Sequence, residues 1–427
     1  MCFPLCMKGL KIKEEEMKKG LSVLVCLSLA ICLFANGAQE QKATVPAAAG
    51  KQKLTLILRG GTYGKVIEKC LPAFEEKNNC EIETLDLSFD DLHSKIALDT
   101  VNKEGAYDLC MVDGSWMAEF TENNVLLNLS KAGYSFDDDI IPATLTICKV
   151  GDDIYLAPYF GNVTVMLYNK ALIKAAGYAS KDIKTWADIQ KIAQVAKASG
   201  KNGYIIRGGS PDNIVSDFLP ILLANGGWVV DANNKPTVDT KEFRAALDQY
   251  ISLYKLGDTM DKDDIVAQID NGNGALAIGW PGWYVPKANS NGDYVTIPST
   301  LDANGKSVNT SLYGVWCIGV CNNSTHKELS VKLLEYLMDK DVLLGTIPEG
   351  GVPCRYSSLK NAEVLKTYPQ LETVCSSLEK GVYRPVIAQW NEFTTILGTE
   401  MDNIIKGTET MDAGLSNAQK QLVDLMK

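Results

Sequence analysis

The chain has 427 residues, of which 46% are hydrophobic and 22% are charged, and its formal net charge is −10. An acidic chain without a cluster of lysines and arginines is not typical of proteins that bind nucleic acids or anionic membrane surfaces. A chain of this length is too long for one ordinary hydrophobic core, so we expect two domains. We expect no cofactor and no nucleic-acid partner.

The N-terminal region has the pattern of a secretory signal peptide. Lys18 and Lys19 precede an apolar stretch from Leu21 to Phe34, and the small residues of Ala35-Asn36-Gly37 follow. A basic segment, a short apolar segment and small residues at a cleavage site are typical of export signals. The apolar stretch is shorter than the roughly 20 residues that a membrane-spanning helix needs. We therefore expect an exported protein.

Two details of this leader, residues 1–37, leave alternatives open. Three glutamates at 14–16 are unusual ahead of a signal peptide, so Met17 is interpreted as the true start. Leu29-Ala30-Ile31-Cys32 loosely matches a lipobox, although Ile31 is bulky and the apolar run continues past the cysteine. We expect a soluble periplasmic protein, with a lipid anchor on Cys32 as the alternative.

Strands and helices alternate after an Ala-, Gln- and Lys-rich tether at 38–53. Periodicity predicts strands at 54–58, 81–87 and 109–112, and helices at 63–77 and 89–102. Strict alternation of this kind indicates a mainly parallel sheet flanked by helices, and hence the α/β class.

The rest of the chain is dominated by helical patterns, with one late strand expected at 315–320. The predicted helices are 185–199, 214–224, 240–256, 328–338, 393–405 and 411–426.

Eight of the twelve cysteines follow the leader, and their spacing does not fix a pairing. Cys317 and Cys321 lie too far apart along one strand to bond each other. No Cys/His pattern suggests a metal site, so most of these cysteines are interpreted as small buried apolar residues. Asp137-Asp138-Asp139 is interpreted as a solvated helix start.

Four stretches, in this order and spacing, resemble the extracellular solute-binding proteins of carbohydrate ABC importers, the maltose-binding protein group. They are Leu156–Tyr159 leading into Val165–Lys170, Asn225–Asp231, Gly274–Trp283, and Arg384-Pro385 followed by Trp390. The resemblance extends from about Leu54 to the C-terminus.

This resemblance implies a two-lobed periplasmic-binding-protein fold of type II. The first lobe is expected at 54–158 and 314–349, and the second lobe at 159–313 and 350–427. A hinge joins the lobes, and a cleft between them closes on a small ligand. The implied partners are that ligand, a sugar by the resemblance, and the transmembrane subunits of an ABC permease. We expect a monomer without catalytic activity.

The candidate site follows from the strand ends and from sugar chemistry. Ligands of open α/β sheets bind beyond the carboxyl ends of the strands. A sugar ring stacks its C–H face on an aromatic ring and presents hydroxyls to polar side chains. The candidate ligand-binding residues are Arg59, Thr62, Tyr63, Asp113, Ser115, Trp116, Tyr159, Asn162, Trp280, Trp283, Tyr284, Trp316, Arg384 and Trp390.

Several of these residues have an alternative role in packing. One of Trp280 and Trp283 is expected to pack and the other to stack, and Trp283 is favoured for stacking because it follows Pro281-Gly282 in a turn. Trp316 lies in an apolar strand and can be core. Asp113 can cap a helix. Trp186 and Trp228 are interpreted as packing residues.

The residues give no positive sign of catalysis. The two histidines, His93 and His326, lie in different parts of the chain, and no nucleophile elbow is present. A secreted glycan-active enzyme or a ligand-sensing adhesin remains the alternative on the same fold. The ligand can be a sugar, an oligosaccharide or a polyol, and Arg59, Arg355 and Arg384 leave a sugar phosphate open.

The leader generates the first prediction. We expect the exported protein to begin at Ala38, because Ala35 and Gly37 occupy the small-residue positions of a cleavage site. N-terminal sequencing of the secreted product checks this, and a lipid-modified Cys32 at the N-terminus would contradict it.

Overall fold

The computed structural model describes residues 51–427 except 288, 299, 302–306 and 309. The predicted leader at 1–37, Cys32 and all but the last three residues of the tether lie outside the described residues. Residues 51–427 form one compact unit. Within the described part of this unit, no helix has both the length and the apolar composition that crossing a membrane requires.

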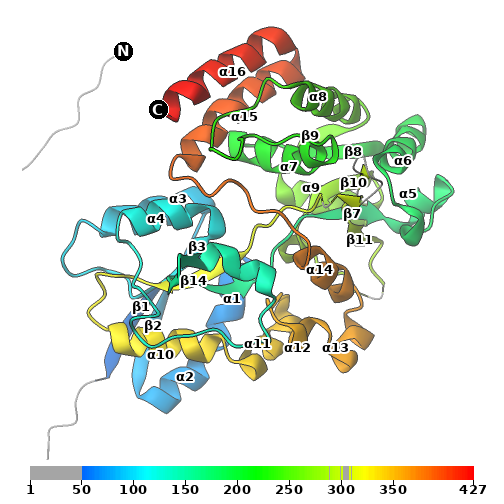
Figure 1. Cartoon of the computed structure of the whole chain (residues 1–427). Helices are drawn as coiled ribbons and strands as arrows, with labels where there is room; N and C mark the ends of the chain where they lie inside the picture. The colour runs from blue at the N-terminus through cyan, green and yellow to red at the C-terminus, as the bar shows by residue number, and fades with distance from the viewer. Residues whose placement is uncertain (1–50, 288, 299, 302–306, 309) are drawn as a thin grey trace, which may run out of the picture. The chain divides into compact units, whose positions relative to one another are not determined.

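A five-stranded sheet with the order β2–β1–β3–β14–β6 carries the first half of the fold (Figure 1). β1 (Gln52–Arg59) pairs in parallel with β2 (Cys80–Leu87) and β3 (Leu109–Asp113). β14 (Trp316–Val320) lies antiparallel between β3 and β6 (Ala157–Phe160). The four predicted strands all lie in this sheet, and the α/β class is confirmed. β1 begins inside the expected tether because Gln52 already pairs with Cys80.

Two helices take the place of the single helix predicted at 63–77. α1 (Thr62–Glu68) ends before a new helix, α2 (Leu71–Asn78), begins. Pro72 stands in the first turn of α2, where its missing N–H is tolerated, whereas inside a continuous helix it would remove a hydrogen bond. The next helix, α3 (Phe89–Asp99), is capped by the hydroxyl of Ser88, which accepts a hydrogen bond from the Asp91 backbone N–H.

A second five-stranded sheet has the order β11–β7–β10–β8–β9. Its strands are β7 (Val165–Asn169), β8 (Asn202–Arg207), β9 (Asp258–Met260), β10 (Gly274–Gly279) and β11 (Gly292–Thr296). β8 and β10 pair in parallel, whereas β7 runs antiparallel to β10 and to β11. β8 was not predicted, because its short apolar run lies between two strong helical patterns.

The helices predicted around the second sheet form close to their predicted bounds. They are α6 (Trp186–Ala198), α7 (Pro211–Ala224), α8 (Lys241–Tyr254), α15 (Trp390–Lys406) and α16 (Met411–Leu425). α7 packs between α8 and α15, and α16 packs on α15 (Figure 1). The large apolar side chains of these helices are buried. α10 (Lys327–Leu337), also predicted, packs instead on β14.

Three chain segments cross between the two sheets and bond to one another. The Tyr313 backbone N–H donates to the Val382 carbonyl oxygen and the Val382 N–H donates to Ser311, both at 2.9 Å. On the other side of this segment, the Thr164 N–H donates to the Leu312 carbonyl at 2.9 Å. Bridges Val163–Tyr313 and Leu312–Val382 complete the crossing. We take the two sheets as the cores of two lobes and these segments as the hinge.

The helices between the second and third crossing segments contact elements of both lobes. α12 (Tyr356–Leu359) contacts α11 (Lys340–Thr346), which follows α10, while α14 (Leu371–Leu378) packs on β11 (Figure 1). The apolar face of α14 therefore joins material of both lobes. The expected assignment of residues 350–427 to the second lobe stays a prediction.

Candidate ligand-binding site

The end of β3 carries a buried ion pair. Asp113 Oδ1 accepts hydrogen bonds from the Ser115 backbone N–H at 2.9 Å and the Ser115 hydroxyl at 2.7 Å, and Arg384 Nη2 also donates to it. Asp113 is 3% exposed and Arg384 is 7% exposed. Burial opposes the charge on Arg384, yet the carboxylates of Asp113 and Asp212 raise the pKa of Arg384 above its ordinary value. The predicted helix cap and the predicted polar partner are thus one connected unit.

A cluster of aromatic side chains lies at the same end of the first sheet. Trp316 is the antiparallel partner of Asp113, and its ring centroid lies 5.6 Å from that of Tyr63 and 5.7 Å from that of Trp116. Phe89 closes the cluster at 4.8 Å from Trp116. These rings pack mainly against one another, so Trp116 and Trp316 form a wall of the first lobe.

Tyr63 and Asn162 connect this wall to the hinge. Asn162 Nδ2 donates to the Tyr63 hydroxyl at 3.2 Å, and Asn162 follows β6 in the first crossing segment. Burial raises the pKa of Tyr63 to about 12, so the phenol stays protonated. A Cβ on Gly282 would lie 3.0 Å from the Tyr63 ring, so the two lobes touch here and a side chain at 282 would push them apart.

The second lobe contributes Arg207, Asp212 and Trp283. Arg207 ends β8, and its guanidinium lies 4.9 Å from the centroid of the Trp283 ring in the turn η4 (Pro281–Trp283). Burial lowers the pKa of Arg207, whereas the carboxylates of Asp212 and Asp217 raise it. Burial raises the pKa of Asp212, whereas the positive charges of Arg384 and Arg207 lower it. Asp113, Arg384, Arg207 and Asp212 therefore lie close enough to influence one another's charge.

The buried polar atoms without a partner among the described residues include one on the hinge and one on the second lobe. These two atoms are Asn162 Oδ1 and Arg207 Nε. A buried donor or acceptor without a partner costs free energy, and native structures satisfy such atoms with protein, water or ligand. An acceptor on the hinge and a donor on the second lobe are thus left unsatisfied by the described residues.

Sequence reasoning missed Arg207 and Asp212. Both follow β8, where the rule of carboxyl-terminal strand ends applies as well as it does to β1 and β3. The apolar run Tyr204-Ile205-Ile206 followed by Gly208-Gly209 was the available signal.

Six predicted residues lie away from this cluster, because their side chains pack or bond elsewhere. Tyr159 is 2% exposed. Burial raises the pKa of its phenol far above the usual range, and the neighbouring Cys70 and Tyr336 act in the same direction. Trp280 packs on Gly314, and Trp390 stacks on Phe393 with ring centroids 5.5 Å apart.

The other three are Arg59, Thr62 and Tyr284. Arg59 Nη1 donates to the Leu87 carbonyl at 3.0 Å, and Thr62 lies beside Gly350. The Tyr284 hydroxyl donates to Asp270 Oδ1 at 2.7 Å. That bond ties the loop after η4 to the end of α9 (Lys262–Asn271).

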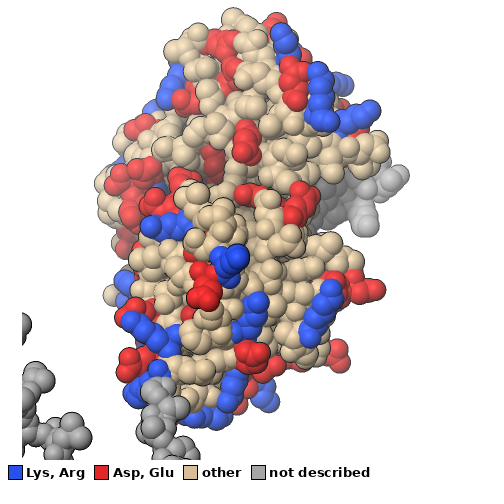
Figure 2. Space-filling model, turned by 90° about the vertical axis from the view of Figure 1, so that its left-hand side faces the viewer, with Lys and Arg blue, Asp and Glu red and all other residues tan. Residues whose placement is uncertain are grey.

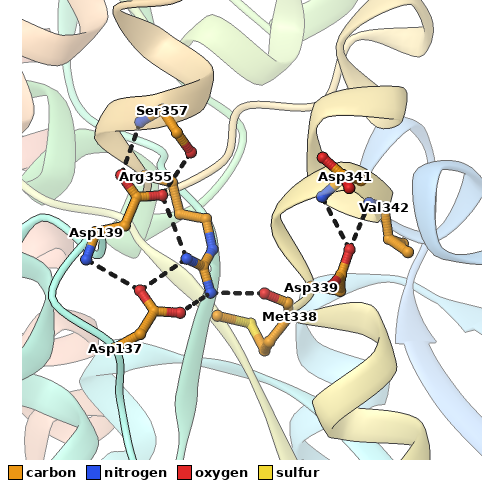
Figure 3. A network of polar contacts seen from close by, with 8 residues as sticks. All are labelled: Asp137, Asp139, Met338, Asp339, Asp341, Val342, Arg355 and Ser357. Atoms are coloured by element: carbon orange, nitrogen blue, oxygen red, sulfur yellow. Dashed lines mark hydrogen bonds and ion pairs between the residues drawn. The ribbon is translucent and has the colours of Figure 1, made fainter.

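Arg355, kept open for a phosphate, is engaged in a separate network (Figure 3). Its Nη1 and Nη2 donate to the Asp137 carboxylate at 2.8 and 2.6 Å, and Nη2 also donates to the Met338 carbonyl at 2.7 Å. Nη1 lies 3.3 Å from Asp139 Oδ2. Asp137–Asp139 form a turn held by this arginine rather than a helix start, because the guanidinium needs their carboxylates as acceptors.

This network lines a groove of about 720 Å³ on the first lobe, beside the start of α11. Among the described residues, no group of three or more His, Cys, Asp or Glu side chains is placed to hold a metal ion. The eight described cysteines form no disulfide, and the sulfur atoms of Cys148 and Cys317 are 3.9 Å apart. On the face in Figure 2, basic side chains are scattered among acidic ones, without a continuous basic stretch in the described part.

Two α/β lobes joined by three crossing segments define a two-lobed fold. Residues 45–342 match the family model of the bacterial extracellular solute-binding proteins, and the chain belongs to this family. It is therefore an exported solute-binding receptor of an ABC importer, which binds a small ligand for delivery to permease subunits. The predicted family is confirmed.

Curated relatives are distant in sequence, but one of them aligns over nearly the whole chain. A probable amino-acid ABC transporter periplasmic-binding protein of Sinorhizobium fredii is 22% identical and is aligned over 97% of this chain and 98% of its own length. The arabinooligosaccharide-binding protein of Bacillus subtilis is 24% identical over 51% of each chain. The maltodextrin-binding protein of the same species is 22% identical over 62% of this chain and 63% of its own.

Solved structures share the fold. Maltose-bound MalE3 of T. maritima superposes with a TM-score of 0.77 at 24% identity, over 87% of this chain and 99% of that one. A ribitol-bound solute-binding protein of Agrobacterium radiobacter gives a TM-score of 0.76 at 21% identity, over 88% of this chain and 98% of that one. The predicted two-lobed type II fold is confirmed.

The geometry predicts different roles for two tryptophans. We expect Trp283→Ala to weaken ligand binding threefold to tenfold, the loss of about 0.5–1.5 kcal/mol of stacking. Trp228→Ala is the matched control, because Trp228 packs on the helices of the second lobe. Titration calorimetry with folded variants checks this. Equal effects of the two changes on affinity would refute the assignment.

Asp217 generates a pH prediction. It is 2% exposed on α7, and its Oδ2 accepts a hydrogen bond from the Tyr250 hydroxyl at 2.9 Å. Burial raises the pKa of Asp217 to about 7, although the Tyr250 hydrogen bond and Arg207 act in the opposite direction. The folded-state pKa thus exceeds the unfolded one, so this group stabilises the protein fully below about pH 4, and the contribution is lost as the pH rises through 7.

We therefore expect Asp217→Asn to gain stability relative to the native protein between pH 5 and pH 8, by roughly 1–3 kcal/mol. An asparagine keeps an acceptor for the Tyr250 hydroxyl. Urea unfolding at both pH values measures the difference, with Asp248→Asn on the exposed face of α8 as the control. An unchanged pH slope in Asp217→Asn contradicts this expectation.

Proposed function

We propose that this receptor binds a sugar, as a single unit or a short oligosaccharide, between its lobes. The observation that carries the proposal is the pairing of Trp283 with Arg207 beside Asp212 and the unbonded Arg207 Nε. An aromatic face next to charged donors and acceptors suits a ring that has C–H faces and a rim of hydroxyls. A hydroxyl can accept from Arg207 and donate to Asp212 at the same time.

The first lobe supplies the complementary wall. Asp113 and Arg384 hold each other, and Asn162 Oδ1 in the first crossing segment is an unused acceptor for a hydroxyl proton. A ligand that bonds Asn162 and Arg207 makes contacts on both sides of the hinge. Such contacts exist together only in the closed state, so the ligand favours closure by its differential affinity. A permease can then distinguish the closed from the open receptor.

Relatives support the sugar class. Their names include arabinooligosaccharide- and maltodextrin-binding proteins, and neighbours were solved with maltose, ribitol, tagatose and mannitol. We also propose that the receptor acts as a monomer without a lipid on Cys32 and returns its ligand chemically unchanged.

An amino acid is the second candidate. The relative aligned over 97% of this chain is named a probable amino-acid transporter component. Arg207 and Asp212 can bind the carboxylate and the ammonium group of such a ligand as well as a pair of hydroxyls. We favour the sugar because the Trp283 ring offers apolar surface for the C–H face of a sugar, which a small amino acid does not have.

A thermal-shift panel tests the proposal. It contains maltose, arabinooligosaccharides, mannitol, ribitol, tagatose, a sugar phosphate and several amino acids. A true ligand at 100 times its Kd stabilises the protein by about 2.7 kcal/mol. We expect a sugar or polyol to give that shift and mass spectrometry to recover it intact. A shift with amino acids alone would select the second candidate, and turnover of the bound sugar would refute the receptor assignment.

A further inference from the structure

A side-chain contact joins the two lobes away from the charged cluster. His93 lies on α3 of the first lobe, and Asn391 lies in the first turn of α15 on the second lobe. Asn391 Nδ2 and His93 Nε2 are 3.2 Å apart. The same Nε2 lies 2.8 Å from the carboxylate of Glu119, which only accepts, so Nε2 carries a hydrogen. The Asn391 amide, turned so that its oxygen faces the ring, then shares this hydrogen with Glu119.

His93 is held in place by its own lobe. Glu119 Oε2 on α4 (Met117–Glu122) lies 2.8 Å from His93 Nε2. The ring stacks on Phe120 with centroids 5.3 Å apart and meets the edge of Trp116 at 5.0 Å. The imidazole therefore has a fixed position on the first lobe, whatever the second lobe does.

Asn391 is equally fixed on the second lobe. Its neighbour Trp390 is 2% exposed and stacks on Phe393. Further along α15, a Cβ on Gly398 would clash with the Pro211 backbone at the start of α7, which shows how closely the two helices approach. The distance between Asn391 and His93 thus reports the relation of the two lobes rather than the mobility of a loop.

We propose that His93 and Asn391 form a latch that stabilises the closed state and thereby sets ligand affinity without contacting the ligand. This inference rests on the proposed closure around a ligand. The observed affinity of a two-state receptor includes the free energy of closing, so a bond present only in the closed form strengthens binding. His93 and Asn391 are accordingly positioning residues.

Removal of the latch should lower affinity and leave the ligand-free protein unchanged. We expect Asn391→Ala to raise the Kd about fivefold, which corresponds to about 1 kcal/mol for one hydrogen bond. Calorimetry uses maltose, or the tightest sugar of the panel if maltose does not bind. Thr395→Ala, one turn further on the exposed face of α15, is the control and should bind normally. The melting temperature of ligand-free Asn391→Ala should equal that of the native protein.

A double-mutant cycle separates the latch from general packing. His93→Ala should cost at least as much affinity as Asn391→Ala, and the two changes together should cost no more than His93→Ala alone. Fully additive effects, or an unchanged Kd in Asn391→Ala, would overturn the proposal.

A second measurement needs no ligand. The variant with both His93→Cys and Asn391→Cys is treated with a short bismaleimide, while the native chain is the control; of its eight described cysteines, all but the partly exposed Cys70 are buried. We expect an intramolecular cross-link and a smaller radius of gyration by X-ray scattering. Failure to cross-link overturns the latch. A cross-link in a protein that binds no member of the panel supports the latch and refutes only the proposed ligand.

Discussion

A single buried carboxylate, that of Asp113, fixes the geometry on which the site depends. It ends β3, orders the next turn through the backbone and hydroxyl of Ser115, and accepts from Arg384, which lies 271 residues further along the chain. Removing one member of such a buried pair costs about 3–5 kcal/mol, because the other charge is left without a partner. The structural role of this pair is to hold the third crossing segment against the end of the first sheet.

Other features follow from that attachment. Trp316 is paired with Asp113 across β3 and β14, so the aromatic wall has the same origin as the ion pair. Arg384 stands six residues before α15, so fixing it also directs this helix toward the first lobe. Arg207 and Asp212 then face a wall whose position is already set, and the charges of both lobes influence one another.

The sequence predicted the fold better than it predicted which residues lie at the candidate site. Buried parallel strands such as β1 and β3 have continuous apolar runs, and helices such as α8 have clear periodicity, so both were recognisable. Which tryptophan faces the cleft depends on register and on contacts hundreds of residues away. Tyr159 and Asn162 are three residues apart, yet one is inside the first lobe and the other bonds Tyr63. Trp280 and Trp283 divide in the same way, with Trp280 packed on Gly314 and Trp283 beside Arg207.

The interleaving of the lobes also has a consequence for biosynthesis. β14 inserts between β3 and β6, and the contact between the Cys110 thiol and the Gly319 carbonyl spans 209 residues. The first sheet therefore cannot close until the ribosome has passed residue 320, and the Asp113 pair must wait for Arg384. Long-range pairings of this kind fold slowly, because a large loop must close before any contact rewards it. The interleaved topology therefore makes completion of the first lobe a late step of synthesis, and leaves its earlier strands without their final partners until most of the chain has been made.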